Sequence, residues 1–217
     1  MYARLTKNNN SGFTLVEVSI VLVVIGLLIG SILVAVNILQ NARITSTIST
    51  LQSIQSAVST YNQNYGAVPG DDAKADTRFG LANKGGGDGI VGNATSYNTA
   101  AALANGNGPA ESRMVWTNLR AAGLIKGDKN DTGFPGNSFG GVFGIQNGAF
   151  TTNGISAGTN VICINNVPGS AAAIIDQRQD DGNPQEGNIR SGTAIDGAAA
   201  ANPYVENNTY ILCTRAL

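Results

Sequence analysis

The amino-acid sequence predicts an α+β protein: one long N-terminal α-helix of about 50 residues, packed on a C-terminal antiparallel β-sheet domain with short accessory helices. Three observations support this prediction. An uncharged apolar run extends from Val18 to Ala42, and an amphipathic pattern of helical period follows it up to Tyr65. Short β-type runs separated by Gly and Asn then fill the C-terminal part of the chain.

The apolar run is long enough to cross a membrane. A bilayer core is spanned by a helix of about 20 residues, and the run contains no charge between Val18 and Ala42. Arg4 and Lys7 precede it without any acid, which favours a cytoplasmic N-terminus. A secretory signal peptide is the alternative, but its apolar core is shorter and ends at a small-residue cleavage site, which this run lacks.

Glu17 is the unusual residue at the front edge of this segment. A carboxylate in the membrane costs a few kcal/mol, so an ordinary anchor would keep it among the lipid headgroups. A cut after Gly12 would instead give Phe13 a new α-amine. That amine could pair with Glu17 of its own chain or of a neighbouring copy, which would neutralise both charges and set the axial register of stacked helices.

The stretch SGFTLVEVSIVLVVIGLLIG resembles the leader junction and N-terminal helix of type IV prepilins and the related pseudopilins. The shared features are a short basic leader ending in Gly12, then Phe13, then Glu17 as the fifth residue after the junction, and an uninterrupted apolar helix. The resemblance implies that a membrane-embedded prepilin peptidase cuts after Gly12 and N-methylates Phe13. It also implies a filament core in which Glu17 meets the Phe13 amine of an adjacent subunit.

The resemblance also implies a pilin-like domain organisation. Residues 1–12 would be the cleaved leader and 13–40 the transmembrane and filament-core helix. Residues 41–65 would continue the helix in amphipathic form, and 66–217 would form an extracytoplasmic globular domain. The precursor would lie in the bacterial inner membrane, and the mature chain in an extracellular or periplasmic filament.

The implied function is that of a structural subunit, a homo-oligomer polymerised through its N-terminal helix by an inner-membrane assembly machinery. Two alternatives stay open: a pseudopilin of a type II secretion system, and a minor tip pilin in adhesion or DNA uptake. Many type IV pilins have a proline eight residues after the glycine that matches Gly26, but this chain has Val34 there. Gly26 and Gly30 remain as weak points of the helix.

Composition argues against an enzyme and against a nucleic-acid binder. The chain has no histidine, which removes the commonest general base and metal ligand. Its net charge is −1, so no basic field attracts nucleic acid. Lys126 and Lys129, near Arg120 and Trp116, offer only thin support for a DNA-uptake variant.

Beyond the apolar run, one stripe recurs at helical spacing and predicts a helix face packed on the domain core. It consists of Ile44, Ile48, Leu51, Ile54, Val58, Tyr61 and Tyr65. Gly66, Pro69 and Gly70 then end the helix.

Further elements follow in the globular part. A second helix is expected with Pro109 at its first position and Gly123 at its end, where Leu124 packs back. Trp116 is expected to pack in the core or on the domain surface, and not to serve as a ligand platform. Residues 139–152 are expected to form a hairpin with its turn at Asn147–Gly148, and residues 159–167 and 208–217 further strands. Residues 169–182 are expected to form a third helix, capped by Ser170 and ended near Gly182.

The two cysteines, Cys163 and Cys213, lie in strand-like runs that could be neighbours, which predicts a disulfide. Two buried free thiols are the alternative. A disulfide here would close a loop of about 50 residues and stabilise the fold by about 4 kcal/mol in the chain-entropy model.

Asp-rich turns raise the question of calcium. Their acids are Asp71, Asp72 and Asp76, then Asp88, then Asp176, Asp180 and Asp181. None of the turns matches the D-x-[DN]-x-[DN]-G pattern of a dedicated calcium loop, so helix caps and Asx-turns are the favoured interpretation. The sequence GGGDG lacks the G-K-[ST] of a phosphate loop. No metal and no cofactor are therefore expected, with calcium left to be tested.

Overall fold

The structure is a computed structural model that describes residues 12–93, 96–98, 106–200 and 202–217. The chain divides into two compact units, and the second begins at Ala42, within helix α1. The described residues form the helices α1 (Leu15–Tyr65), α2 (Ala75–Phe79), α3 (Glu111–Ala121) and α4 (Gly169–Gln179). The strands are β1 (Phe143–Ala149), β2 (Ile155–Pro168), β3 (Ile189–Gly192) and β4 (Thr209–Arg215). The α+β class is thus confirmed.

Helix α1 buries the predicted stripe. Five of its members are buried in the main core, and the other two pack against that core while half-buried. Tyr65 is the last helical residue, and Gly66 follows with φ of 63°, a left-handed conformation that glycine adopts without strain. The spacing of apolar residues therefore predicted the buried face, and Gly66 predicted the end of the helix.

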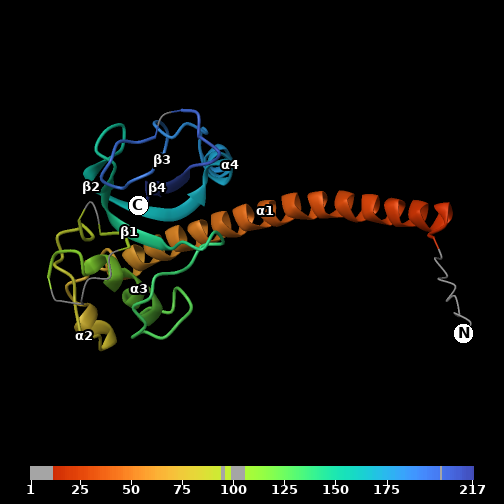
Figure 1. Ribbon diagram of the computed structural model, residues 1–217. Helices are drawn as coiled ribbons and strands as arrows, with labels where there is room; N and C mark the ends of the chain where they lie inside the picture. Colours follow the sequence, from red (N-terminus) through yellow and green to blue (C-terminus); the bar gives the residue numbers. More distant parts are fainter. Residues whose placement is uncertain (1–11, 94–95, 99–105, 201) are drawn as a thin grey trace, which may run out of the picture. The chain divides into compact units, whose positions relative to one another are not determined.

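The four strands form one antiparallel sheet in the order β1-β2-β4-β3, with β2 and β4 in its centre (Figure 1). Side chains alternate between its two faces, as the period of a strand requires. On β2, Ile162 and Ile164 enter the main core with α1, α3 and α4. Val161 and Cys163 face the other side and form a second, smaller core with Phe150.

The hairpin prediction for residues 139–152 is wrong. Strand β1 runs through Asn147–Gly148 and pairs with β2, and the chain reverses at residues 150–154. Gly148 has φ of 68°, but it lies where the register shifts between Asn147 and Ala149, which is a bulge in the strand. The Asn147 side chain accepts a hydrogen bond from the Gly158 amide across the ladder at 2.5 Å. The dipeptide Asn-Gly therefore occurs in a β-bulge as well as in a hairpin turn, and it does not distinguish between them.

Helix boundaries differ from the expectation in two places. Helix α4 begins at Gly169 after Pro168, which places Ser170 within the first turn instead of at the cap. Helix α3 begins at Glu111, two residues after Pro109. Its end is as predicted: the Leu124 amide donates to the Leu119 carbonyl at 2.9 Å, and Gly123 has φ of 69°.

Trp116 of α3 is completely buried in the main core, as expected. Helix α2 and strand β3 were not predicted. Strand β3 is only four residues long, and it pairs with β4 from Ile189 to Gly192.

Candidate functional site

The start of α1 is fixed by a reciprocal pair of side chains, Thr14 and Glu17. The Thr14 hydroxyl accepts a hydrogen bond from the Glu17 amide at 3.2 Å. In return, Glu17 Oε2 accepts from the amide and from the hydroxyl of Thr14, both at 2.8 Å. This arrangement is a capping box, which satisfies backbone amides that a helix N-terminus leaves unpaired. Glu17 therefore has a local structural role within its own chain.

Behind the capping box, α1 presents apolar side chains on all sides. The large apolar residues from Phe13 to Leu39 whose side chains are described are all exposed, and Phe13 is 88% exposed. Within the described residues, α1 is the one helix long and apolar enough to cross a membrane, judged by length and composition. Gly26, Gly30 and Val34 lie inside this continuous helix. Such an apolar surface requires a lipid or protein neighbour.

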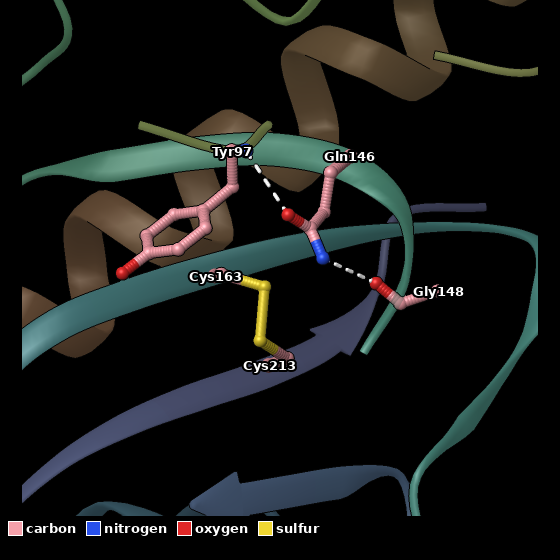
Figure 2. Close-up of a disulfide and its surroundings, with 5 residues drawn as sticks. All are labelled: Tyr97, Gln146, Gly148, Cys163 and Cys213. Atoms are coloured by element: carbon pink, nitrogen blue, oxygen red, sulfur yellow. Dashed lines mark hydrogen bonds between the residues drawn. A yellow bond between two sulfur atoms is a disulfide. The ribbon is translucent and has the colours of Figure 1, made fainter. Parts of the chain in front are cut away.

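The two cysteines form a disulfide across the central strands of the sheet. Cys163 of β2 lies directly opposite Cys213 of β4, with 4.1 Å between their Cα atoms. Figure 2 shows the disulfide beneath Tyr97 and Gln146. The Gln146 side chain accepts from the Tyr97 amide at 3.0 Å and donates to the Gly148 carbonyl at 2.6 Å, which ties Tyr97 to β1.

Two buried carboxylates hold the glycine-rich loop at residues 85–92. Asp71 accepts hydrogen bonds from the amides of Gly87, Asp88 and Gly89 at 2.5, 3.2 and 2.6 Å. Glu111 accepts from three further glycine amides, those of residues 86, 92 and 108, at 3.0, 3.0 and 3.4 Å. Burial raises the pKa of Glu111, and the glycine amides oppose that rise. These acids therefore bind backbone amides, which is a structural role.

Replacing Asp71 by asparagine is expected to lower the free energy of unfolding by about 1–3 kcal/mol, because one oxygen becomes an NH₂ group that faces buried amide donors. The measurement is urea unfolding of the full chain in detergent, followed by the fluorescence of Trp116, the chain's one tryptophan. Asp196→Asn is the matched control, because Asp196 is exposed. Equal stabilities of the two variants would contradict this role.

The other two acids in the Asp-rich turn that contains Asp71 also have protein partners. Asp72 accepts from the Tyr61 hydroxyl at 2.7 Å, from the Lys74 amide at 2.8 Å and from the Arg78 guanidinium. Asp76 lies 3.6 Å from the Lys84 ammonium. The interpretation of these residues as turn-forming and structural acids therefore fits their contacts.

The acids at the end of α4 differ from the others, because they gather. In the described part of the chain, Asp176, Asp180 and Asp181 are the one group of three acids whose carboxylate oxygens lie within 4.8 Å of one another. Burial raises the pKa of Asp176 to about 6, against the hydrogen bond from the Tyr204 hydroxyl. The charges of Asp181 and Asp180 raise it further, and the Gly182 amide lowers it.

Two of the three basic residues considered for DNA are held by protein contacts, and the third, Lys126, is exposed. Arg120 donates to the carbonyls of Asp131 and Gly133 at 2.6 and 2.8 Å, and Lys129 donates to the Phe79 carbonyl at 3.1 Å. Trp116 is buried and cannot stack on a base. These residues form no exposed basic and aromatic strip.

Sequence reasoning missed the hydrogen-bond partners of two acids, Glu17 and Asp176. Thr14 could have been found, since T-x-x-E before an apolar run is the signature of a capping box. Tyr204, which donates to Asp176 at 2.6 Å, is 28 residues away from it, and no local pattern links them.

Comparison with known proteins gives one match. Residues 7–33 match the family model described as the prokaryotic N-terminal methylation motif. No curated protein and no solved structure matches the chain.

Proposed function

Since this chain carries the N-terminal methylation motif that marks the type IV pilins and pseudopilins, we propose that it is a structural subunit of a type IV pilus-like filament. The motif belongs to structural, non-enzymatic proteins, so the proposed activity is assembly and not turnover. The precursor inserts in the inner membrane, a prepilin peptidase cuts it between Gly12 and Phe13, and the mature chain polymerises through α1.

The observation that carries this proposal is the apolar surface of α1, exposed from Phe13 to Leu39. In the membrane, lipid covers this surface, and in a filament the same segment of other copies would cover it. Burial of apolar area contributes about 25 cal/mol per Å² whenever the alternative is water. The apolar surface of α1 therefore needs an apolar neighbour both in the membrane, before assembly, and in the filament, after it.

Glu17 supplies the directional contact in this proposal. Both hydrogen bonds from Thr14 go to Oε2, and no group among the described residues donates to Oε1. The amine of Phe13 from a neighbouring copy can therefore bind Oε1 while the capping box stays formed. In apolar surroundings such a pair removes two uncompensated charges, which favours one axial register over others.

A pseudopilin of a type II secretion system is the second candidate, and the observation that favours it is Val34. A helix without proline at this position keeps its backbone hydrogen bonds, and α1 is helical throughout Leu15–Tyr65. The disulfide and the glycine- and asparagine-rich loops of the globular part favour the pilus.

Processing gives the direct test. Mass analysis of the protein from the cell surface is expected to show a chain that begins with N-methyl-Phe13, because the leader ends at Gly12. The control is the same protein from cells that lack the prepilin peptidase, where the leader should persist. Electron microscopy of sheared surface material then shows whether the protein forms the body of a filament. An intact leader in peptidase-containing cells would overturn the proposal.

A further inference from the structure

Four asparagines of the chain stand in the sequence N-x-[ST], the acceptor pattern of asparagine-linked glycosylation. They are Asn9, Asn93, Asn130 and Asn207. Asn9 lies before the proposed cleavage point, and the pattern of Asn93 includes residues 94–95, which fall outside the described residues. The patterns of Asn130 and Asn207 lie wholly within the described part of the chain, and both of these asparagines are exposed.

The loop between α3 and β1 presents Asn130 with its side-chain amide free. No described residue forms a hydrogen bond with this amide, although the backbone amide of Asn130 donates to Asp128 Oδ1 at 2.8 Å. The hydroxyl of the pattern belongs to Thr132, and it accepts from the Arg113 guanidinium at 2.6 Å. An acceptor asparagine must be accessible and unpaired, because its amide nitrogen becomes the atom that bears the saccharide. Asn130 meets both conditions.

Backbone contacts hold this loop in one conformation and leave the asparagine uncovered. The Asp131 amide donates to the Asp128 carbonyl at 3.0 Å, and the Gly133 amide donates to Asp131 Oδ1 at 2.8 Å. Arg120 of α3 donates to the carbonyls of Asp131 and Gly133. None of these contacts uses the Asn130 side chain, so a saccharide attached there leaves all of them in place.

A cavity of about 190 Å³ lies beside Asn130. Its lining includes Lys129, Asn130 and Thr132 together with Leu81 and Met114. The wall therefore offers an ammonium and a hydroxyl next to apolar side chains. A sugar ring has the same mixture, because its hydroxyls bind polar groups while its C–H faces pack on apolar ones. The cavity can thus seat the first sugar attached to Asn130.

We propose that Asn130 is the acceptor of an asparagine-linked saccharide. In the transfer, the amide nitrogen of Asn130 attacks the anomeric carbon of a saccharide that is carried on a polyprenyl pyrophosphate in the membrane. A C–N bond forms as the bond from that carbon to the pyrophosphate oxygen breaks. The pyrophosphate leaves with the electron pair, and the amide loses one proton to a base of the transferase.

This chain supplies only the acceptor, and a separate transferase in the membrane supplies the catalysis. The bulky, polar product suits an exposed loop of a protein outside the cytoplasm. The inference therefore rests on one part of the proposed function, the extracytoplasmic position of the globular domain, and it does not depend on polymerisation.

Two features separate Asn130 from Asn207. Asp128 lies two residues before Asn130, where Asn207 has Val205. A transferase that holds a pyrophosphate-linked donor needs a cationic site, and an acid next to the acceptor is attracted to such a site. The pattern of Asn207 instead continues into the sheet, where Thr209 begins β4. Asn130 is therefore the better acceptor of the two.

Peptide mass analysis of the protein purified from the cells that produce it tests the inference. We expect the native peptide that contains Asn130 to be heavier than its sequence by one saccharide, and fragmentation to place the added mass on Asn130. Asn130→Gln should lose this mass, and so should Thr132→Ala, in which the asparagine itself is unchanged. Thr132→Ser keeps the hydroxyl of the pattern and should keep the saccharide.

Asn207→Gln is the matched control, because it removes an exposed asparagine of the same pattern and should leave the mass on Asn130 unchanged. The inference is overturned if Asn130 of the native protein is unmodified, or if Thr132→Ala carries the same added mass as the native protein. Filaments built from unmodified subunits would overturn this inference alone. A chain that carries the saccharide but never enters filaments would count against the filament and support the inference.

Discussion

Alanine in place of Glu17 is expected to abolish filament assembly while leaving cleavage after Gly12 intact. Loss of the helix cap costs about 1 kcal/mol, which a helix of 51 residues can tolerate. Loss of the charge leaves the neighbour's amine without a partner in apolar surroundings, and this costs about 3–5 kcal/mol at each subunit contact. Each 1.4 kcal/mol is about tenfold in an equilibrium constant, so polymer should fall below detection in sheared fractions.

Glutamine at the same position separates the two roles of Glu17. Its side-chain oxygen can still accept from the Thr14 amide, so Glu17→Gln keeps the capping box and removes only the charge. We expect this variant to fail in assembly as Glu17→Ala does, whereas Thr14→Ala, which keeps the charge, should still assemble. If Glu17→Gln forms normal filaments, the carboxylate acts only as a cap and the proposed pairing is wrong.

Removal of the disulfide is the change with the largest expected effect on stability. The double variant Cys163→Ala/Cys213→Ala should lose about 4 kcal/mol in free energy of unfolding, because the bond closes a loop with a sequence separation of 50. The loss should appear as a lower urea midpoint of the globular part in detergent. Both cysteines are fully buried, so each variant also loses some packing.

The single variant Cys163→Ala separates the packing loss from the covalent contribution. It lacks the disulfide but keeps one native sulfur, so it should be nearly as unstable as the double variant. The native protein with its disulfide reduced should also approach this value. A difference of less than about 1 kcal/mol between native and double variant would contradict a stabilising role for the bond.

The features that sequence predicted best are those with a strong period. The apolar stripe from Ile44 to Tyr65 fixes which face of α1 is buried, since a helix repeats every 3.6 residues. The predicted apolar face of α3 is also buried at Val115 and Leu119. The strand expected at residues 159–167 lies within β2, whose side chains alternate between the two cores, with Ile162 in one and Cys163 in the other. In each case several residues at regular spacing indicate the same type of element and the same buried face.

Local signals with two meanings caused the errors. Asn147–Gly148 permits a left-handed glycine, which serves a bulge as well as a turn, and only the pairing of β1 with β2 decides between them. Strand β3 is too short for a pattern, and it is recognised only by its pairing with β4, which no local sequence signal predicts. Ser170 is an ordinary cap residue, yet the helix begins earlier at Gly169.

The candidate sites likewise divide into features that a local sequence pattern reveals and features that depend on distant contacts. The N-terminal junction is visible in sequence because its residues are neighbours, and Thr14 was available by the same reasoning. The acids at the end of α4 were visible as a turn, but the buried state of Asp176 and its contact with Tyr204 come from distant parts of the chain. Sequence therefore could not separate it from the turn with Asp71, whose acids bind amides.

The cross-strand disulfide also sets how far a subunit can be stretched. Cys163 and Cys213 are fastened face to face, so a pulling force cannot open the ladder between β2 and β4 at this point. With a separation of 50 residues and about 3.4 Å per residue, about 170 Å of contour length stays locked inside the covalent loop. In the proposed filament, a subunit under tension would therefore reach this limit before its chain was fully extended.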